Sequence, residues 1–132
     1  ATPAGHFRLI EVRFRPDRIA PFETALPIFP ICEDDGWCDD PVHPDYNQPI
    51  VLPHLASHER LWRDDSLYDV IVVTDHNQAP TVPGAGSAIF IHISGGLDYP
   101  PTEGCVAFSR EDLISILSRW SEEDRLSVVG VP

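Results

Sequence analysis

The stretch YDVIVVT, residues 68–74, is the part of the chain that decides the fold. Four of its residues, Val70, Ile71, Val72 and Val73, form an unbroken run that is both apolar and β-branched, and β-branched side chains favour extended backbone. A run that is apolar on both alternating faces is typical of a strand covered on both sides. We therefore expect residues 68–74 to form an interior strand of a sheet.

Two further strands are expected at the ends of the chain. Residues 6–15 place Ile10, Val12 and Phe14 on one side and mostly polar residues on the other. Residues 125–131 are predicted to close the chain as a last strand.

Residues 87–94 are predicted to form another strand, and the orientation of its side chains matters for function. Ile89, Ile91 and Ile93 share one face, because successive side chains of a strand point to opposite faces. The other face carries Ala88, Phe90 and His92. The sequence therefore predicts that His92 points away from the isoleucine face.

The clearest helical pattern follows Ser109. A serine suits the N-cap position, and the acidic residues Glu111 and Asp112 suit a first helical turn. The apolar residues that follow form one stripe at helical spacing, namely Leu113, Ile116, Leu117 and Trp120. A second, short helix is predicted over residues 53–63, with Pro53 in its first turn.

The stretch from Pro16 to Pro53 has almost no regular periodicity and is rich in Pro, Asp and Gly. A loop of that length in a compact domain is usually functional, so we expect an ordered excursion that faces the substrate. Residues 75–86 are predicted to form a further loop, because Pro and Gly interrupt them. The predicted fold class is mainly β, with one or two helices packed against the sheet.

Composition limits the classes of function. A chain of 132 residues suits one core, so we expect a single domain over residues 1–132. The formal charge of -12, from 9 basic and 21 acidic residues, repels nucleic acid and anionic membrane surfaces. No apolar run approaches the roughly 20 residues that a membrane-spanning helix needs. Neither nucleic acid binding nor a membrane span is expected.

A histidine near the end of the strand at residues 87–94 is followed, before the Ser109 helix, by a cysteine. Residues 92–105 are HISGGLDYPPTEGC, so the imidazole at a strand end is followed by a Gly- and Pro-rich loop and a thiol. An imidazole within hydrogen-bond reach takes the thiol proton, and the resulting ion pair stabilises the nucleophilic thiolate. Backbone amides at Gly104 and Cys105 can donate to a developing oxyanion. Such acyl transfer requires no metal or cofactor.

The pattern alone leaves a second interpretation open. Cys105 can be a small buried apolar residue, and His92 a core histidine whose ring nitrogens bind backbone groups.

This region resembles the active-site region of the L,D-transpeptidase catalytic domain family, of the YkuD type. The similar stretches are GAGSAIFIH at residues 84–92 and PTEGCVA at residues 101–107. TPAGHF at residues 2–7 is also similar, and DGWCDDP at residues 35–41, with Tyr46-Asn47, resembles a block of one bacterial branch. The resemblance covers most of the chain. It implies the family's β-sandwich, shortened at the amino-terminal end so that the first strand or strands are lacking.

The resemblance implies acyl transfer between peptidoglycan stem peptides. Cys105 attacks the donor stem peptide and expels D-alanine, with His92 as general base and acid and the Gly104 backbone in the oxyanion hole. The amine of an acceptor stem peptide, an anchored lipoprotein or water then resolves the thioester. Carbapenems acylate members of this family. The implied role is in cell wall biogenesis and cell shape, in the periplasm or cell envelope, although residues 1–5 hold no signal peptide.

Two other functions remain as alternatives. With water as acceptor the same scaffold is an L,D-carboxypeptidase or amidase. A noncatalytic peptidoglycan-binding module belongs to another class, and the pairing of a histidine with Gly-Cys favours an enzyme because a binding module does not need it.

The substrate cleft is expected to be lined by Trp37, His76, Asn77, Thr102 and Glu103. Two positions depart from the commoner family pattern. Ile93 follows the histidine where many members have glycine, and Ala107 stands where many members have arginine. The usual arginine of the donor site is therefore missing from its position.

The other thiols and imidazoles allow several interpretations. Cys32 and Cys38 can form a local disulfide, or Cys38 can lie as a thiol near the active site with Trp37 as a cleft wall or packed onto the sheet. His54 and His58 are four residues apart, yet no third zinc ligand has the right spacing, so a solvated helix face is preferred. The acidic residues at 33–35 and 39–40 lack the EF-hand pattern and can instead attract the ammonium group of a diamino acid stem.

Overall fold

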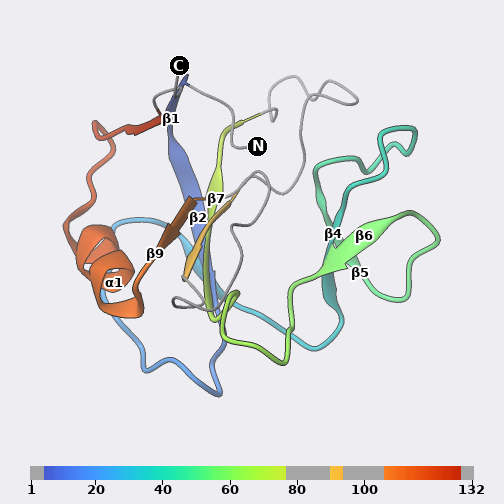
Figure 1. Cartoon of the computed structure of the whole chain (residues 1–132), viewed down its shortest axis with the longest axis horizontal. Helices are drawn as coiled ribbons and strands as arrows, with labels where there is room; N and C mark the ends of the chain where they lie inside the picture. Colours follow the sequence, from blue (N-terminus) through green and yellow to red (C-terminus); the bar gives the residue numbers. More distant parts are fainter. Residues whose placement is uncertain (1–4, 77–89, 94–105, 129–132) are drawn as a thin grey trace.

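Residues 5–76, 90–93 and 106–128 are described by the structure, a computed structural model (Figure 1). The described ranges hold ten short strands and one helix. The elements are β1 (Gly5–Phe7), β2 (Leu9–Phe14), β3 (Ile28–Pro30), β4 (Asp35–Cys38), β5 (Pro49–Val51), β6 (His58–Arg60), β7 (Val70–Thr74), β8 (Phe90–Ile93), β9 (Val106–Phe108), α1 (Arg110–Arg119) and β10 (Leu126–Val128).

A five-stranded sheet with the order β3-β2-β7-β8-β9 forms the centre of the molecule. β7 is the middle strand and pairs antiparallel with both β2 and β8, whereas the outer pairs β2–β3 and β8–β9 are parallel. Every residue of β7 is buried. The prediction of an interior strand from the β-branched run is confirmed.

The helix α1 covers one face of this sheet. Ser109 caps it as predicted, since its side chain accepts a hydrogen bond from the Asp112 N–H at 3.2 Å. Leu113 and Leu117 of the predicted stripe are fully buried. They pack in one cluster with alternate residues of the sheet strands, including Val12, Val70, Val72, Ile91 and Ile93.

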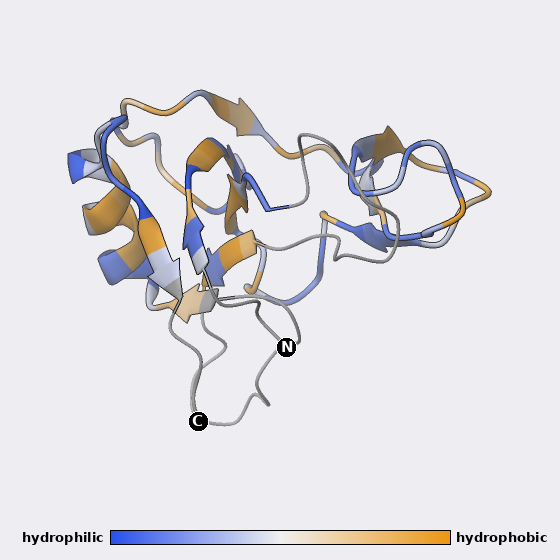
Figure 2. Cartoon of the chain, turned by 90° about the horizontal axis from the view of Figure 1, so that it is seen from above, coloured by the Kyte–Doolittle hydropathy of each residue, from blue (hydrophilic) through white to orange (hydrophobic). Residues whose placement is uncertain are grey.

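The opposite face of the sheet is covered by a three-stranded antiparallel sheet with the order β5-β4-β6. A second apolar cluster fills this side with Ile31, Trp37, Leu61, Leu67, Tyr68, Ile71, Val73 and Phe90. In Figure 2, α1 and the three-stranded sheet lie at opposite ends of the view, with the central sheet between them. The molecule is therefore mainly β, with layered sheets and one helix among its described residues.

The alternation of β8 is confirmed by the two clusters. Ile91 and Ile93 belong to the cluster under α1, whereas Phe90 belongs to the cluster facing β4. Because His92 has the parity of Phe90, it lies on the side of the three-stranded sheet. No helix within residues 5–76, 90–93 and 106–128 is long and apolar enough to cross a membrane.

The amino-terminal strand differs from its prediction. The expected single strand over residues 6–15 consists of β1, paired antiparallel with the predicted last strand β10, and β2, paired with β7. A register irregularity between Leu9 and Glu11 changes which side chains point inward. As a result Leu9 and Val12 are buried, while Ile10 is 37% exposed. A bulge of this kind shifts the alternation by one residue.

The predicted loop at residues 16–53 was partly wrong, because it contains β3, β4 and β5. Each of these strands has three or four residues, too few to display an alternating pattern. The predicted helix at residues 53–63 is also wrong. That segment contributes β6, which pairs with β4, and Leu55 of the supposed apolar stripe is fully exposed at 105%.

Candidate active site

His92 lies on β8, within the central sheet, and its side chain is almost completely covered, with 1% exposed. Its Nδ1 lies 2.8 Å from the carbonyl oxygen of Ile93, and since a carbonyl only accepts, Nδ1 carries the proton. A neutral imidazole in this tautomer has its lone pair on Nε2. The strand and its own backbone therefore fix the ring in the form of a proton acceptor.

The environment of His92 keeps the ring neutral. Burial lowers the pKa of His92 below its ordinary value of 6.5, because the charged form loses solvation. The hydrogen bond to Ile93 acts in the opposite direction, and the nearby Arg63 lowers the pKa further. At neutral pH this histidine is poised to accept a proton rather than already protonated.

Aromatic rings surround His92 on its side of the sheet. The Tyr68 ring meets the imidazole edge to face, with 5.7 Å between the centroids, and also contacts Phe90 at 5.9 Å. Trp37 of β4 packs against Phe90 at 5.0 Å. This packing couples the three-stranded sheet to the strand that carries the histidine.

Trp37 packs the three-stranded sheet onto the central sheet, which is one of its two expected roles. Only 2% of it is exposed, and its Nε1–H donates to Asn47 Oδ1 at 3.0 Å. Asn47, in the left-handed backbone conformation with φ 59°, also donates through Nδ2 to the carbonyl oxygen of His76 at 3.2 Å. The Phe7 ring contacts His76 at 5.7 Å. Trp37 and His76 are thus connected through one buried asparagine.

A carboxylate and a phenol that sequence reasoning missed lie next to this group. The Tyr68 hydroxyl donates to Glu59 Oε1 at 3.2 Å, so Glu59 of β6 is joined to the ring that touches His92. Burial raises the pKa of Glu59 above its ordinary value of 4.5, and the negative charge of Asp39 raises it further, while the Tyr68 hydrogen bond partly offsets both. Asp39 Oδ1 is buried and has no hydrogen-bond partner.

No sequence motif marked Glu59 as part of this site. β6 pairs antiparallel with β4, so Glu59 lies opposite Trp37. This pairing brings Glu59 to the face of the central sheet that the three-stranded sheet covers.

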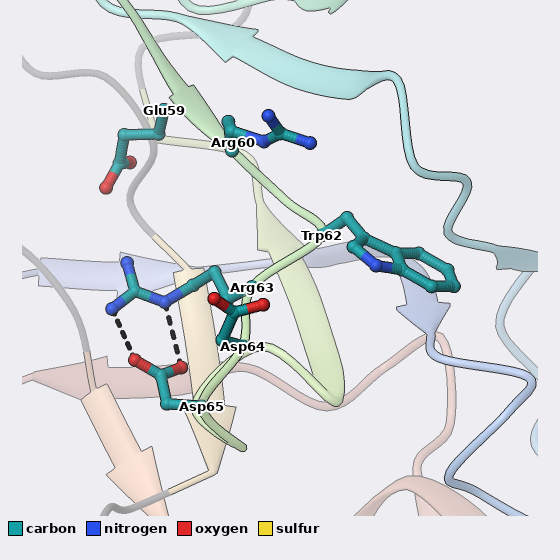
Figure 3. Close-up of a pocket in the computed structure, with 6 residues that line it drawn as sticks. All are labelled: Glu59, Arg60, Trp62, Arg63, Asp64 and Asp65. Carbon is teal, nitrogen blue, oxygen red and sulfur yellow. Dashed lines mark hydrogen bonds and ion pairs between the residues drawn. The ribbon is translucent and has the colours of Figure 1, made fainter.

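A hollow of ≈ 560 Å³ opens beside these residues and is lined by Glu59, Arg60, Trp62, Arg63, Asp64 and Asp65. Figure 3 shows Glu59 and the Arg63–Asp65 pair on the same side of the chain, with Trp62 pointing the other way. Arg63 holds Asp65 by two hydrogen bonds of 2.9 and 2.6 Å and lies 5.2 Å from the Tyr68 ring centre. The hollow therefore offers a cation and carboxylates near Tyr68.

The thiol predicted to be the nucleophile lies outside the described residues. Cys105 directly precedes Val106 in the chain, and Val106 begins β9 and pairs with Ile91, the neighbour of His92. The other predicted residues outside the described ranges are Asn77, Thr102, Glu103 and Gly104.

The structure excludes one of the two interpretations of Cys32 and Cys38. Cys32 and Cys38 do not form a disulfide, since Cys32 is exposed while Cys38 is buried in the small cluster between β4 and β5.

Fold and site together define a class of protein: a layered β domain with a neutral, strand-borne histidine beside a polar hollow. The sequence model described as the L,D-transpeptidase catalytic domain matches residues 1–129, and the chain belongs to this family. No curated protein and no solved structure matches the chain. The family connects the chain with peptidoglycan peptides.

Proposed function

We propose that this protein is a peptidoglycan L,D-transpeptidase that forms cross-links between stem peptides through a thioester on Cys105. The observation that carries the proposal is His92, a buried neutral imidazole whose Nδ1–H is fixed by Ile93 and whose lone pair is on Nε2. The pairing of β8 with β9, next in the chain to Cys105, supports the same assignment.

In the first step Nε2 of His92 takes the thiol proton of Cys105, and the sulfur bonds to the carbonyl carbon between the third and fourth residues of the donor stem. The carbon–nitrogen bond to D-alanine breaks, and His92 returns the proton to the leaving amine. The backbone N–H groups at Gly104 and Cys105 stabilise the oxyanion. In the second step an acceptor amine attacks the thioester, an amide forms and the thiol is regenerated.

Negative charge beside the hollow suits a donor stem that carries a diamino acid. Glu59 lines the hollow and is half-buried, and the negative charge of Asp39 acts on it. An ammonium group bound in the hollow would pair with Glu59 and offset the cost of burying its charge. Thr102, Glu103, Asn77 and His76 would line the rest of the cleft. The site of action is the periplasm or cell envelope.

Product analysis with purified tetrapeptide muropeptides tests the proposal. The expected products are cross-linked dimers and free D-alanine, both lost in Cys105→Ala. Cys32→Ala is the matched control, because Cys32 is an exposed thiol. Tripeptide monomers without dimers would show that water resolves the thioester, and that result would contradict transpeptidation in favour of a carboxypeptidase.

A further inference from the structure

Three side chains that can bind a metal ion meet in the three-stranded sheet region, apart from His92 and its neighbours. They are His43, Asp45 and His54, and each offers one ligand atom within 4.8 Å of the other two. His54 Nε2 lies 3.3 Å from Asp45 Oδ2, and His43 Nδ1 lies 3.8 Å from the same oxygen. The two imidazole rings contact each other with 4.9 Å between their centroids.

The sequence spacing paired His54 with His58 and indicated neither His43 nor Asp45. His58, four residues after His54, is not in this group of ligand atoms. Its Nδ1–H donates to the carbonyl oxygen of Ala56 at 2.8 Å. His43 and Asp45 come instead from the connection between β4 and β5, whereas His54 comes from the segment between β5 and β6. The pairing of both β5 and β6 with β4 brings these two connections together.

The distances are close to those of a coordination sphere. Metal bonds of about 2.0–2.1 Å in a tetrahedron place neighbouring ligand atoms about 3.3 Å apart. The His54–Asp45 distance already has this value, and the His43–Asp45 distance exceeds it by about 0.5 Å. The ligand atoms of the third pair, His43 and His54, lie within 4.8 Å of each other. Closing the site therefore requires the two imidazoles to approach each other by at most about 1.5 Å, and a water molecule can complete the tetrahedron.

The exposure of the three side chains allows an ion to enter from solvent. The Asp45 side chain is 51% exposed, while those of His43 and His54 are 32% and 19% exposed. One carboxylate oxygen faces both imidazoles, so the ligands are held partly assembled before an ion arrives.

Without an ion, each ring accepts a hydrogen bond from a backbone amide. His54 Nδ1 accepts the Ala56 N–H, and His43 Nδ1 accepts the Asp45 N–H, each at 3.0 Å. Since a ring that accepts through Nδ1 carries its proton on Nε2, His54 donates from Nε2 to Asp45. An ion at this position moves the His54 proton to Nδ1 and gives both amides to water.

We propose that His43, Asp45 and His54 bind one divalent transition-metal ion, of which zinc is the representative. Two imidazoles and one carboxylate are a donor set suited to zinc and its neighbours, whereas calcium and magnesium prefer oxygen ligands alone. The bound ion joins the β4–β5 connection to the segment before β6. The same connection carries Asn47, which holds Trp37 and His76, so the ion stiffens the layer that covers the His92 face.

Metal titration of the full-length chain tests this site. Zinc is added in competition with a chromophoric chelator, and cobalt(II) is added separately to record its visible spectrum. The Cys32→Ala/Cys105→Ala background removes two thiols that can bind zinc themselves. We expect one ion per chain, a cobalt spectrum typical of tetrahedral nitrogen and oxygen ligands without a thiolate charge-transfer band, and a higher Tm with zinc.

The variants separate this site from other metal-binding groups. His54→Ala and His43→Ala should each weaken zinc binding by about 10–100-fold or more and abolish the zinc-dependent rise in Tm. His58→Ala is the matched control and should bind zinc like the parent. Zinc affinity that is unchanged in His54→Ala, or a folded parent protein that binds no zinc, would overturn the proposal. Neither result depends on transpeptidase activity, so this inference fails or stands independently of the proposed function.

Discussion

At the scale of single residues, His92 has opposite requirements placed on it. It is part of the apolar interior, yet in the proposed reaction it exchanges a proton with a thiol. The strand meets both requirements, because Ile93 O binds the Nδ1–H and burial keeps the ring uncharged.

The lowered pKa of His92 predicts where the acylation rate falls on the acid side of the pH–rate profile. Since burial lowers the pKa of His92 below 6.5, the rate of Cys105 acylation should fall only at a pH below 6.5. Protonation of the ring should also destabilise the fold there, because a depressed histidine pKa contributes stability above 6.5 that is lost as the pH falls through the folded pKa. Single-turnover acylation rates measured across pH check this. An acid limb centred at 6.5 or above would contradict it.

For Glu59 we expect the opposite pH dependence of stability. Because burial raises the pKa of Glu59 above 4.5, its contribution to stability is complete below 4.5 and is lost as the pH rises through the folded pKa. Glu59→Gln keeps a hydrogen-bond acceptor for Tyr68 without the charge, so at pH 7 it should be at least as stable as the parent. At pH 4 this advantage should vanish. Urea unfolding at pH 7 and at pH 4 measures the difference in the free energy of unfolding between variant and parent. A variant that is less stable than the parent at pH 7 but not at pH 4 would contradict this prediction.

At the scale of elements, the amount that the sequence could predict depended on element length and on local chemistry. β7 and α1 were predictable, because a β-branched run and a capped apolar stripe carry their own pattern. The orientation of His92 followed from strand alternation alone, and it is confirmed by the two clusters.

The short strands β3 to β6 could not be predicted, since three or four residues obtain their strand conformation from the partner strand rather than from alternation. For the same reason, the sequence did not indicate the polar side chains that gather around these strands. Glu59 and Asp39 approach each other only because β6 pairs with β4, and the cluster of His43, Asp45 and His54 joins two loops.

The cap of α1 permits a quantitative test at this scale. Ser109→Ala removes the acceptor of the Asp112 N–H and should cost about 1 kcal/mol of the free energy of unfolding. Ser118→Ala is the control, because Ser118 is exposed within the helix, where alanine is a better helix former. Chemical denaturation of both variants gives the comparison. Equal losses in the two would show that the Ser109 side chain does not act as the cap.

At the scale of the whole molecule, Asp69 joins parts that are distant in sequence. It is 1% exposed and precedes β7, and its carboxylate accepts from Arg18 at 3.0 Å and from Arg110 at 3.2 Å. Arg18 follows β2, and Arg110 begins the helix that follows β9. One buried carboxylate thus connects the segment after β2 and the start of α1 to the residue that precedes the middle strand β7.

Asp69→Asn removes the charge while keeping the shape, and it leaves two cations without their buried partner. We expect a loss of about 1–3 kcal/mol in the free energy of unfolding, since hydrogen bonds to charged groups are worth that much. Asp34→Asn is the control, because Asp34 is exposed and the same change there removes a solvated carboxylate. A loss in Asp69→Asn no larger than that in the control would contradict the connecting role.

The central claim is that Cys105 is a nucleophile activated by His92, and intact-protein mass spectrometry after incubation with a carbapenem tests it most directly. The account predicts one covalent adduct per chain, kept in Cys32→Ala, lost in Cys105→Ala, and formed about 10²–10⁴-fold more slowly in a folded His92→Gln variant. A folded parent protein that forms no adduct, or an adduct that persists in Cys105→Ala, would contradict it.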